Sequence, residues 1–269
     1  MIAIRPEEIL PLAQYVHGLS GISLDEKKAY LFESRFGPLL EDLGLKTYNE
    51  LLIKARADLS HKLEQRIIDA ITTNETLFFR DSSPFEVLQH KIVPDLIDSR
   101  TARSTGNLPI RLKIWSAACS TGQEVYSIAI VLKELLAGNP RYSVSLLGTD
   151  LSDAAIAQAS YGQYNRFEIE RGLPGDKLKK YFEPNGASWK IRDEIRAMAS
   201  FRKINLMQPF NHLGKFDIIF CRNVAIYFTL EDRKRLFDRL RLLRHLTVAL
   251  VGHFFSVSTG SSTTSASTT

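Results

Sequence analysis

From Arg111 onward, short apolar segments alternate with longer amphipathic ones, and a polar turn follows each apolar segment. The apolar segments have the length and composition of buried strands, and the segments after them have helical spacing. The pairs are Leu112–Trp115 with Glu124–Leu136, Val144–Gly148 with Asp153–Ala159, and Phe216–Cys221 with Leu230–Leu243. Strands that alternate with helices predict an α/β fold, with a mostly parallel, Rossmann-like sheet covered on both faces.

In a sheet of this kind, ligands bind at the carboxyl ends of the strands, near the point where the strand order reverses. This rule selects Ala117–Gly122, Asp150 and Cys221–Asn223. The small residues of the first turn let a ligand approach the backbone, and a carboxylate at Asp150 can accept hydrogen bonds from ribose hydroxyls. The alternatives are an ordinary strand-to-helix connection and a helix cap. The turn holds one glycine, so it lacks the dinucleotide fingerprint, which disfavours a nicotinamide enzyme.

The first seventy or so residues have a helical pattern without strand alternation. Ser23–Glu26 and Thr47–Glu50 each place a hydroxyl three residues before a Glu, which is the spacing of a capping box, and Gly44 is positioned to end a helix. We therefore expect a small all-helical N-terminal domain over residues 1–72.

Other segments fall outside the strand-helix alternation. Ser83 and Pro84 predict the start of another helix, which should run towards Leu96, and Ser99–Asn107 should form a surface loop. Residues 161–200 are rich in charge and turn formers, and predict a strand-rich subdomain inserted into the fold. Residues 256–269 are small and polar, so a disordered tail is expected there.

Composition limits the location and the partners of the chain. It has no apolar run long enough to span a membrane and no signal-peptide pattern, so it should be cytoplasmic and not inserted in a membrane. Cys119 and Cys221 have no metal-ligand spacing; we expect free thiols and no metal site. The formal charge of +5 comes from the C-terminal half, where solvated helix faces explain it as well as an acidic partner does.

Five motifs carry a resemblance to a known family. In order and spacing they are similar to those of the chemotaxis receptor glutamate O-methyltransferase (CheR-type) family: Thr73–Arg80, Trp115–Glu124, Gly148–Ser152, Asn205-Leu206 and Phe216–Phe228. The resemblance covers about residues 1 to 230. It implies a class I methyltransferase domain over residues 73–255, which uses S-adenosylmethionine to esterify receptor glutamates and releases S-adenosylhomocysteine.

The resemblance also implies which side chains hold the cofactor. Glu124 would contact the methionine amino group and Asp150 the ribose, while Asn205 and Leu206 would contact the adenine. The complete implied set of cofactor-binding residues is Asn74, Thr76, Arg80, Ala118, Glu124, Asp150, Asn205, Leu206, Arg222 and Asn223.

Arg80 and Tyr227 are the catalytic residues that the resemblance implies, with Arg80 near the reacting methyl group and Tyr227 facing the acceptor. A packing role is the alternative for Tyr227. A glutamate with a pKa of about 4.3 is already an anion at neutral pH, so it can attack the methyl group without a general base. We therefore expect positioning to be the main task of the protein.

The resemblance further implies a partner, the helical bundle of a chemoreceptor cytoplasmic domain. Lys62 and Arg66, one helical turn apart, are candidates for receptor contact, and a solvated face is their alternative. In some family members the inserted subdomain docks a peptide at the receptor C-terminus through a glycine-bearing loop. Here the corresponding segment, Glu183–Trp189, is short and holds one glycine, so we expect no need for that peptide.

After Phe228 the chain departs from the family pattern. Val248–Val251 can form a strand, but the glycine turn and the Gly-x-Ser-Glu segment expected of a member are missing. Two alternatives to a monomeric active enzyme follow: a catalytically impaired relative that binds cofactor and serves as a receptor interaction module, or a nucleic-acid methyltransferase. The second is supported only by the basic charge and by a faint motif at Asn205–Phe210, so we expect no nucleic-acid partner.

Overall fold

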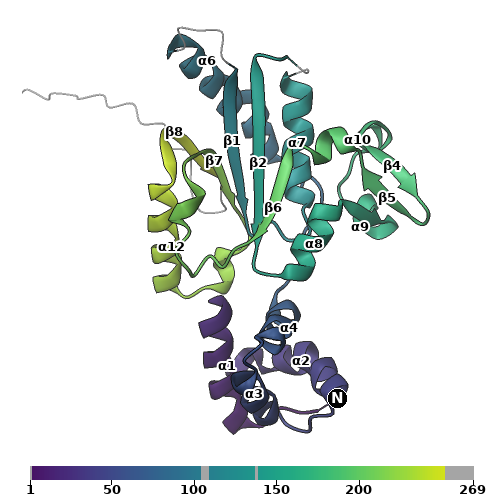
Figure 1. The fold of residues 1–269 in the computed structure, drawn as a ribbon, viewed down its shortest axis with the longest axis vertical. Helices are drawn as coiled ribbons and strands as arrows, with labels where there is room; N and C mark the ends of the chain where they lie inside the picture. The colour runs from purple at the N-terminus through teal and green to yellow at the C-terminus, as the bar shows by residue number, and fades with distance from the viewer. Residues whose placement is uncertain (1, 104–108, 137–138, 252–269) are drawn as a thin grey trace, which may run out of the picture.

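The computed structural model describes residues 2–103, 109–136 and 139–251. Figure 1 shows a small helical unit at one end of the molecule and a larger α/β unit at the other. The predicted fold class is confirmed in its three parts: the helical N-terminal unit, the parallel sheet and a small antiparallel sheet.

The N-terminal unit consists of the helices α1 (Pro6–Ser20), α2 (Ala29–Leu43), α3 (Tyr48–Ala57) and α4 (Lys62–Ile71). They enclose their own apolar core, which includes Phe32, Phe36 and Leu51. Thr47 caps α3 as predicted, and Gly44 ends α2 with a φ of 66°.

The cap predicted at Ser23 is wrong. The side chain of Asp25 accepts the hydrogen bond from the amide of Lys28 instead, at the start of a short 3-10 turn, Glu26–Lys28. Asp25 satisfies the amide donors that begin this turn, so the helix starts later than the spacing of Ser23 and Glu26 predicted.

The larger unit is built on a five-stranded parallel sheet in the order β6-β2-β1-β7-β8. Its strands are β1 (Ile110–Ala117), β2 (Tyr142–Asp150), β6 (Ala199–Lys203), β7 (Phe216–Cys221) and β8 (Arg244–Val251). The order reverses next to β1, so the carboxyl end of β1 lies at the switch point where ligands bind in such sheets.

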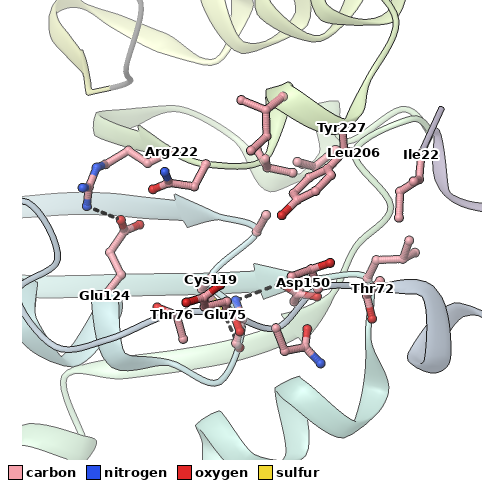
Figure 2. Close-up of a pocket in the computed structure, with 18 of the residues that line it drawn as sticks. Ile22, Thr72, Glu75, Thr76, Cys119, Glu124, Asp150, Leu206, Arg222 and Tyr227 are labelled. Atoms are coloured by element: carbon pink, nitrogen blue, oxygen red, sulfur yellow. Dashed lines mark hydrogen bonds and ion pairs between the residues drawn. The ribbon is translucent and has the colours of Figure 1, made fainter. Parts of the chain in front are cut away.

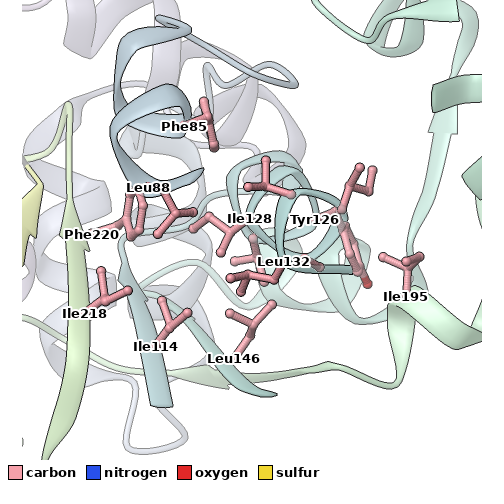
Figure 3. Close-up of a cluster of buried hydrophobic side chains, with 14 of the residues drawn as sticks. Phe85, Leu88, Ile114, Tyr126, Ile128, Leu132, Leu146, Ile195, Ile218 and Phe220 are labelled. Atoms are coloured by element: carbon pink, nitrogen blue, oxygen red, sulfur yellow. The ribbon is translucent and has the colours of Figure 1, made fainter. Parts of the chain in front are cut away.

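Helices cover both faces of this sheet. They are α5 (Ser83–Val87), α6 (Val93–Arg103), α7 (Gln123–Leu136), α8 (Asp153–Tyr161) and α12 (Leu230–Leu242), with a π turn, Leu88–Ile92, between α5 and α6. Figure 3 shows one face, where Phe85 and Leu88 meet α7 residues such as Ile128 above Ile114 of β1. On the other face Leu236 of α12 belongs to the cluster that holds Trp115 and Ile219.

Two predicted boundaries in this unit need correction. The helix expected to end near Leu96 continues to Arg103, so residues 99–103 of the predicted loop are helical, while 104–107 lie outside the described residues. The predicted insert of 161–200 includes the start of β6, which belongs to the main sheet. Three of its five residues, Ala-Ser-Phe-Arg-Lys, are polar or charged, and it is an edge strand, so it lacks the apolar run that marks a buried strand.

The small antiparallel sheet has the order β3-β5-β4, with β3 (Gln163–Asn165), β4 (Phe182–Asn185) and β5 (Ser188–Ile191). Two short helices, α9 (Arg166–Glu170) and α10 (Gly175–Tyr181), lie between β3 and β4, and α11 (Asp193–Arg196) leads back to the main sheet. Phe182 and Ile191 join the core of the larger unit, so this subdomain is anchored beside α7.

The C-terminal end of the described chain is β8, which pairs in parallel with β7 and contains the predicted strand Val248–Val251. The predicted disordered tail, 256–269, lies outside the described residues. Among the helices that the structure describes, none combines the length and apolarity that a membrane crossing needs.

Candidate active site

A cavity of about 1140 Å³, including its open mouth, lies at the carboxyl ends of β1, β2 and β7. Figure 2 shows Glu124 and Arg222 at one end of it, and Thr72 and Ile22 at the other. The structure brings every predicted cofactor and catalytic residue to this cavity: Asn74, Thr76, Arg80, Ala118, Glu124, Asp150, Asn205, Leu206, Arg222, Asn223 and Tyr227.

Lys62 and Arg66 do not line the cavity. Both are exposed on α4, on the side opposite its buried residues Leu63 and Ile67. Arg66 is paired with Asp42 at 2.5 Å, so part of its charge is already neutralised.

The turn after β1 has an unusual backbone. Ala118 and Ser120 have φ values of 60° and 51°, in the left-handed region that non-glycine residues rarely adopt. Gly122 also has a positive φ, and a Cβ there would lie 2.9 Å from the Cβ of Ala159, so glycine is required. The Oγ of Ser120 is buried and has no hydrogen-bond partner among the residues that the structure describes, which marks a place where a ligand can complete the site.

Backbone strain is concentrated around the cavity. Six non-glycine residues among those described have a positive φ, and five of them lie in the three loops that form its walls. These five are Phe79, Asp81, Ala118, Ser120 and Asn223. Each such residue costs free energy that packing elsewhere must offset, and strain of this kind is typical of functional sites.

Glu124 lies in the first turn of α7 and is held from two sides. Its Oε1 accepts a hydrogen bond from the Ser116 hydroxyl at 2.8 Å, and its Oε2 pairs with Arg222 at 2.9 Å. Burial raises the pKa of the Glu124 carboxyl, and the charge of Arg222 opposes that rise. A ligand ammonium group at this carboxylate would be paired with a negative charge in a poorly solvated place.

Arg222 connects β7 to the loop that carries the first motif. Its side chain is 2% exposed, and besides Glu124 it donates to the carbonyl oxygen of Arg80 at 2.8 Å and to Asp81 at 2.9 Å. The guanidinium group of Arg222 therefore holds the Glu124 carboxylate and the loop at Arg80 and Asp81 in place through charge-assisted hydrogen bonds.

Asp150 ends β2 and accepts two backbone hydrogen bonds, from Ser120 at 2.8 Å and from Ser152 at 3.0 Å. Burial raises the pKa of this carboxyl, and the backbone amides of Ser152, Ser120 and Leu151 oppose the rise. A carboxylate has about four acceptor positions, so Asp150 retains the capacity for two more hydrogen bonds. A ribose with vicinal hydroxyls fits that capacity.

Asn205 lines the cavity next to Ile204, whose amide donates to the carbonyl oxygen of Asp150 at 2.8 Å, and it is tied to the N-terminal unit. Its Nδ2 donates to the carbonyl oxygen of Leu19 at 2.8 Å, and its Oδ1 accepts from the amide of Met207 at 2.9 Å. One N–H of its amide stays available for a ligand. Leu206 beside it is buried and supplies an apolar surface on which a flat ring can pack.

Arg80 and Tyr227 also line the cavity, and both are partly exposed to solvent. Arg80 donates to the carbonyl oxygen of Glu75 at 3.0 Å, and the Glu75 carboxylate pairs with Arg171 of the inserted subdomain at 3.1 Å. Tyr227 lies above the cavity, opposite Asp150 in Figure 2, and its carbonyl oxygen accepts a hydrogen bond from Ser23 at 2.8 Å. A cation and a phenol therefore belong to the partly exposed lining of the cavity.

Several lining residues were not predicted from the sequence. Glu75 lies inside the first motif, where its neighbours Asn74 and Thr76 were selected and it was not, whereas Cys119 and Ser120 lie in the turn Ala117–Gly122 that the strand-end rule selected. Ser20 and Ile22 come from the end of α1, and no local pattern marks them because only the packing of the N-terminal unit brings them to the cavity.

Comparison with known proteins places both units in one family. Residues 7–72 match the profile described as CheR methyltransferase, all-alpha domain, and residues 74–267 match CheR methyltransferase, SAM binding domain. The chain is 39% identical over 239 residues to chemotaxis protein methyltransferase Cher2 of Pseudomonas putida, covering 87% of this chain and 83% of that one. It is 34% identical over 255 residues to the chemotaxis protein methyltransferase of Borreliella burgdorferi, covering 94% and 89%.

These matches span the helical unit, the cavity and the inserted sheet together. The fit of the site agrees with them, because two carboxylates and an unpartnered serine hydroxyl line a cavity suited to a nucleoside with a charged amino-acid end. The resemblance noted from the sequence motifs is confirmed: the chain belongs to the CheR methyltransferase family, with a SAM-binding domain preceded by the family's all-alpha domain.

Proposed function

We propose that this protein methylates glutamate side chains on the cytoplasmic helical bundle of a chemoreceptor, and so adjusts the receptor during sensory adaptation. The observation that carries the proposal is the single cavity in which Glu124, Asp150, Arg80 and Tyr227 meet. We further propose that it acts in the cytoplasm as a monomer. Its free thiols, Cys119 and Cys221, suit a reducing compartment.

Bound S-adenosylmethionine would supply a methyl group activated by its sulfonium charge. Glu124 would hold the amino group of the methionine part, and Asp150 would accept hydrogen bonds from the ribose. Asn74, Thr76 and Ala118 line the same space, with Leu206 on the adenine side and Asn223 on the far wall. Asp150 is buried and the Glu124 side chain is 13% exposed, so both carboxylates act in surroundings where their hydrogen bonds are strong.

Arg80 and Tyr227 would orient the acceptor carboxylate at the mouth. Because that carboxylate is ionised at neutral pH, neither residue has to remove a proton from it. An in-line approach of the nucleophile at about 3–3.5 Å can contribute about 7–11 kcal/mol to lowering the barrier. Lys62 and Arg66, exposed on α4, are our candidates for attracting the acidic receptor surface.

Substitution of Arg80 and of Tyr227 tests these roles. We expect Arg80→Ala and Tyr227→Phe to lower kcat on a receptor fragment by about 100-fold and about 10-fold, because misplacement of a reacting group by about 1 Å costs roughly that much. The affinity for S-adenosylhomocysteine, measured by calorimetry, should change less than kcat for Tyr227→Phe. Wild-type turnover in both variants would show that these residues do not orient the acceptor.

The binding of S-adenosylhomocysteine should weaken in acid. Burial raises the pKa values of Glu124 and Asp150 above their ordinary values of 4.5 and 3.8, and a bound ammonium or hydroxyl donor favours their ionised forms. Affinity should therefore be constant above the raised pKa values and fall as the pH drops through them. Calorimetry at a series of pH values measures this. The variant Glu124→Gln should bind more weakly and show a shallower fall; the same slope in the variant would exclude Glu124 as a contributor.

The receptor C-terminal peptide should not be needed for methylation. In the structure β4 and β5 form a tight hairpin, with Asn185 paired to Ser188 across a two-residue turn at Gly186, so no extended loop is present there to hold a peptide. We expect a receptor truncated before its C-terminal peptide to be methylated within about twofold of the intact receptor. A rate loss of about tenfold or more would contradict this.

A further inference from the structure

Three hydrogen bonds join the N-terminal unit to residues that line or support the cavity. The Nδ2 of Asn205 donates to Leu19, the amide of Ser23 donates to Tyr227, and the hydroxyl of Ser152 donates to Asp69 at 2.7 Å. The first two use backbone groups of the N-terminal unit. The third uses a side chain of α4, so it is the one that a substitution in the N-terminal unit can remove.

Ser152 is fully buried, and each of its polar groups has a defined partner. Its amide donates to Asp150 at 3.0 Å, and its Oγ accepts from the amide of Ala155 at 3.1 Å as the N-cap of α8. The single hydrogen of its hydroxyl goes to Asp69, 83 residues away in the sequence. Asp69 therefore fixes the orientation of the residue whose amide holds the Asp150 carboxylate.

We propose that Asp69, on the N-terminal unit, is a positioning residue for the nucleoside end of the cofactor and acts on Asp150 through Ser152. The inference rests on the role proposed above for Asp150 as the acceptor of the ribose hydroxyls. It means that the unit carrying the candidate receptor contacts also sets the geometry of the cofactor site. A shift of α4 on receptor contact would then be transmitted to the cofactor by this hydrogen bond.

The charge of Asp69 has a second effect on Asp150, which opposes the effect of the hydrogen bond, and the test must separate the two. Burial is the main cause of the raised pKa of Asp150, and the negative charge of Asp69 adds to it. Removing the charge alone favours the ionised form of Asp150 and does not weaken binding. Asp69→Asn removes the charge and keeps a carbonyl oxygen that can accept from Ser152, whereas Asp69→Ala removes both.

The chain offers a matched control in another contact of α4. Lys203, the last residue of β6, donates to Gln65 of α4 and to Asp153 at 2.8 Å. Lys203→Ala therefore removes a side-chain link between the two units and leaves the hydrogen bonds of Ser152 and of the Asp150 carboxylate in place; Gln65, which it releases, also donates to Asp69 at 3.2 Å. If the link between units were all that mattered, this variant and Asp69→Ala would behave alike.

The experiment is calorimetric titration of the full chain with S-adenosylhomocysteine and with its 2′,3′-dideoxy analogue, which lacks both hydroxyls that Asp150 would accept from. We expect Asp69→Ala to weaken the binding of S-adenosylhomocysteine by about fivefold, on the order of one hydrogen bond, and the binding of the dideoxy analogue by less than twofold. The affinities of Asp69→Asn and Lys203→Ala for both ligands should stay within about twofold of the wild-type values. Ser152→Ala should lose at least as much affinity as Asp69→Ala, because it also removes the N-cap of α8, and the double variant should lose no more than Ser152→Ala alone.

The inference would be overturned if Asp69→Ala weakened the binding of both ligands equally, or kept wild-type affinity. A positioning role at the ribose requires that the effect depend on the ribose hydroxyls of the ligand. Circular dichroism checks the fold of each variant. Should Asp69→Ala not fold, Ser152→Ala removes the same hydrogen bond from the other side and gives the same comparison. A wild-type chain that binds neither ligand would contradict the proposed function itself.

Discussion

Asp150→Ala is expected to abolish measurable binding of S-adenosylhomocysteine at micromolar concentrations. The carboxylate is buried and oriented by two amides, at 2.8 and 3.0 Å, with two acceptor positions left for the ligand. A hydrogen bond to a charged group contributes about 1.5–3 kcal/mol, so losing two of them lowers affinity by about 100-fold or more. Calorimetry with the wild-type chain and the variant measures the difference.

Asp153→Ala provides the matched control for that substitution. Asp153 lies three residues further along the chain, and its side chain is about half exposed, paired only with Lys203 among the ion pairs of the described residues. It does not line the cavity, so its removal should leave affinity within about twofold. Equal losses in the two variants would indicate a general effect of carboxylate removal, and an unchanged affinity in Asp150→Ala would exclude the ribose role.

Arg222→Met should reduce both stability and ligand affinity. The substitution leaves Glu124, whose side chain is 13% exposed, without the cation that holds it at 2.9 Å. Breaking a buried ion pair from one side costs about 3–5 kcal/mol, because the remaining charge stays desolvated. It also frees the loop at Arg80, whose carbonyl oxygen loses its donor. Urea unfolding measures the stability change, and calorimetry with S-adenosylhomocysteine measures the affinity.

An exposed ion pair provides the control for the stability effect of Arg222→Met. Arg166 and Glu170 are paired at 2.6 Å on α9, with side chains 77% and 61% exposed. Arg166→Met should change the free energy of unfolding by less than about 0.5 kcal/mol, as surface pairs of this spacing do. If Arg222→Met lowered the free energy of unfolding no more than Arg166→Met does, the contacts that Arg222 makes between β7 and the first motif would not contribute to stability.

The sequence was informative where one face or both faces of an element are buried. Strands such as Phe216–Cys221, buried at every position, appear as continuous apolar runs, and their polar ends identify the cavity. The edge strand Ala199–Lys203 was missed because its exposed positions break the run. The helix start at Ser23 was misplaced because Asp25, two residues later, competes successfully for the same role.

Contacts between the two units could not be predicted from the chain alone. The link from Asp69 to Ser152 and the contribution of Ser20 to the cavity join positions far apart in the sequence, and no periodicity encodes them. Arg222 was expected in the cavity wall, but its position behind Glu124 depends on the packing of β7 against the first motif. The chemistry of single residues was thus more predictable than the pairs they form.

The most direct test of the proposed function is the chemical nature of the transferred methyl group. The purified chain is incubated with methyl-labelled S-adenosylmethionine and a chemoreceptor cytoplasmic fragment, and the labelled receptor is then treated with alkali. We predict label on the receptor that alkali releases as methanol, and an initial rate of labelling that falls by about 100-fold with Arg80→Ala. Label that resists alkali, or label on nucleic acid in place of receptor, would contradict glutamate esterification; no label from a chain that binds S-adenosylhomocysteine would indicate a catalytically impaired relative.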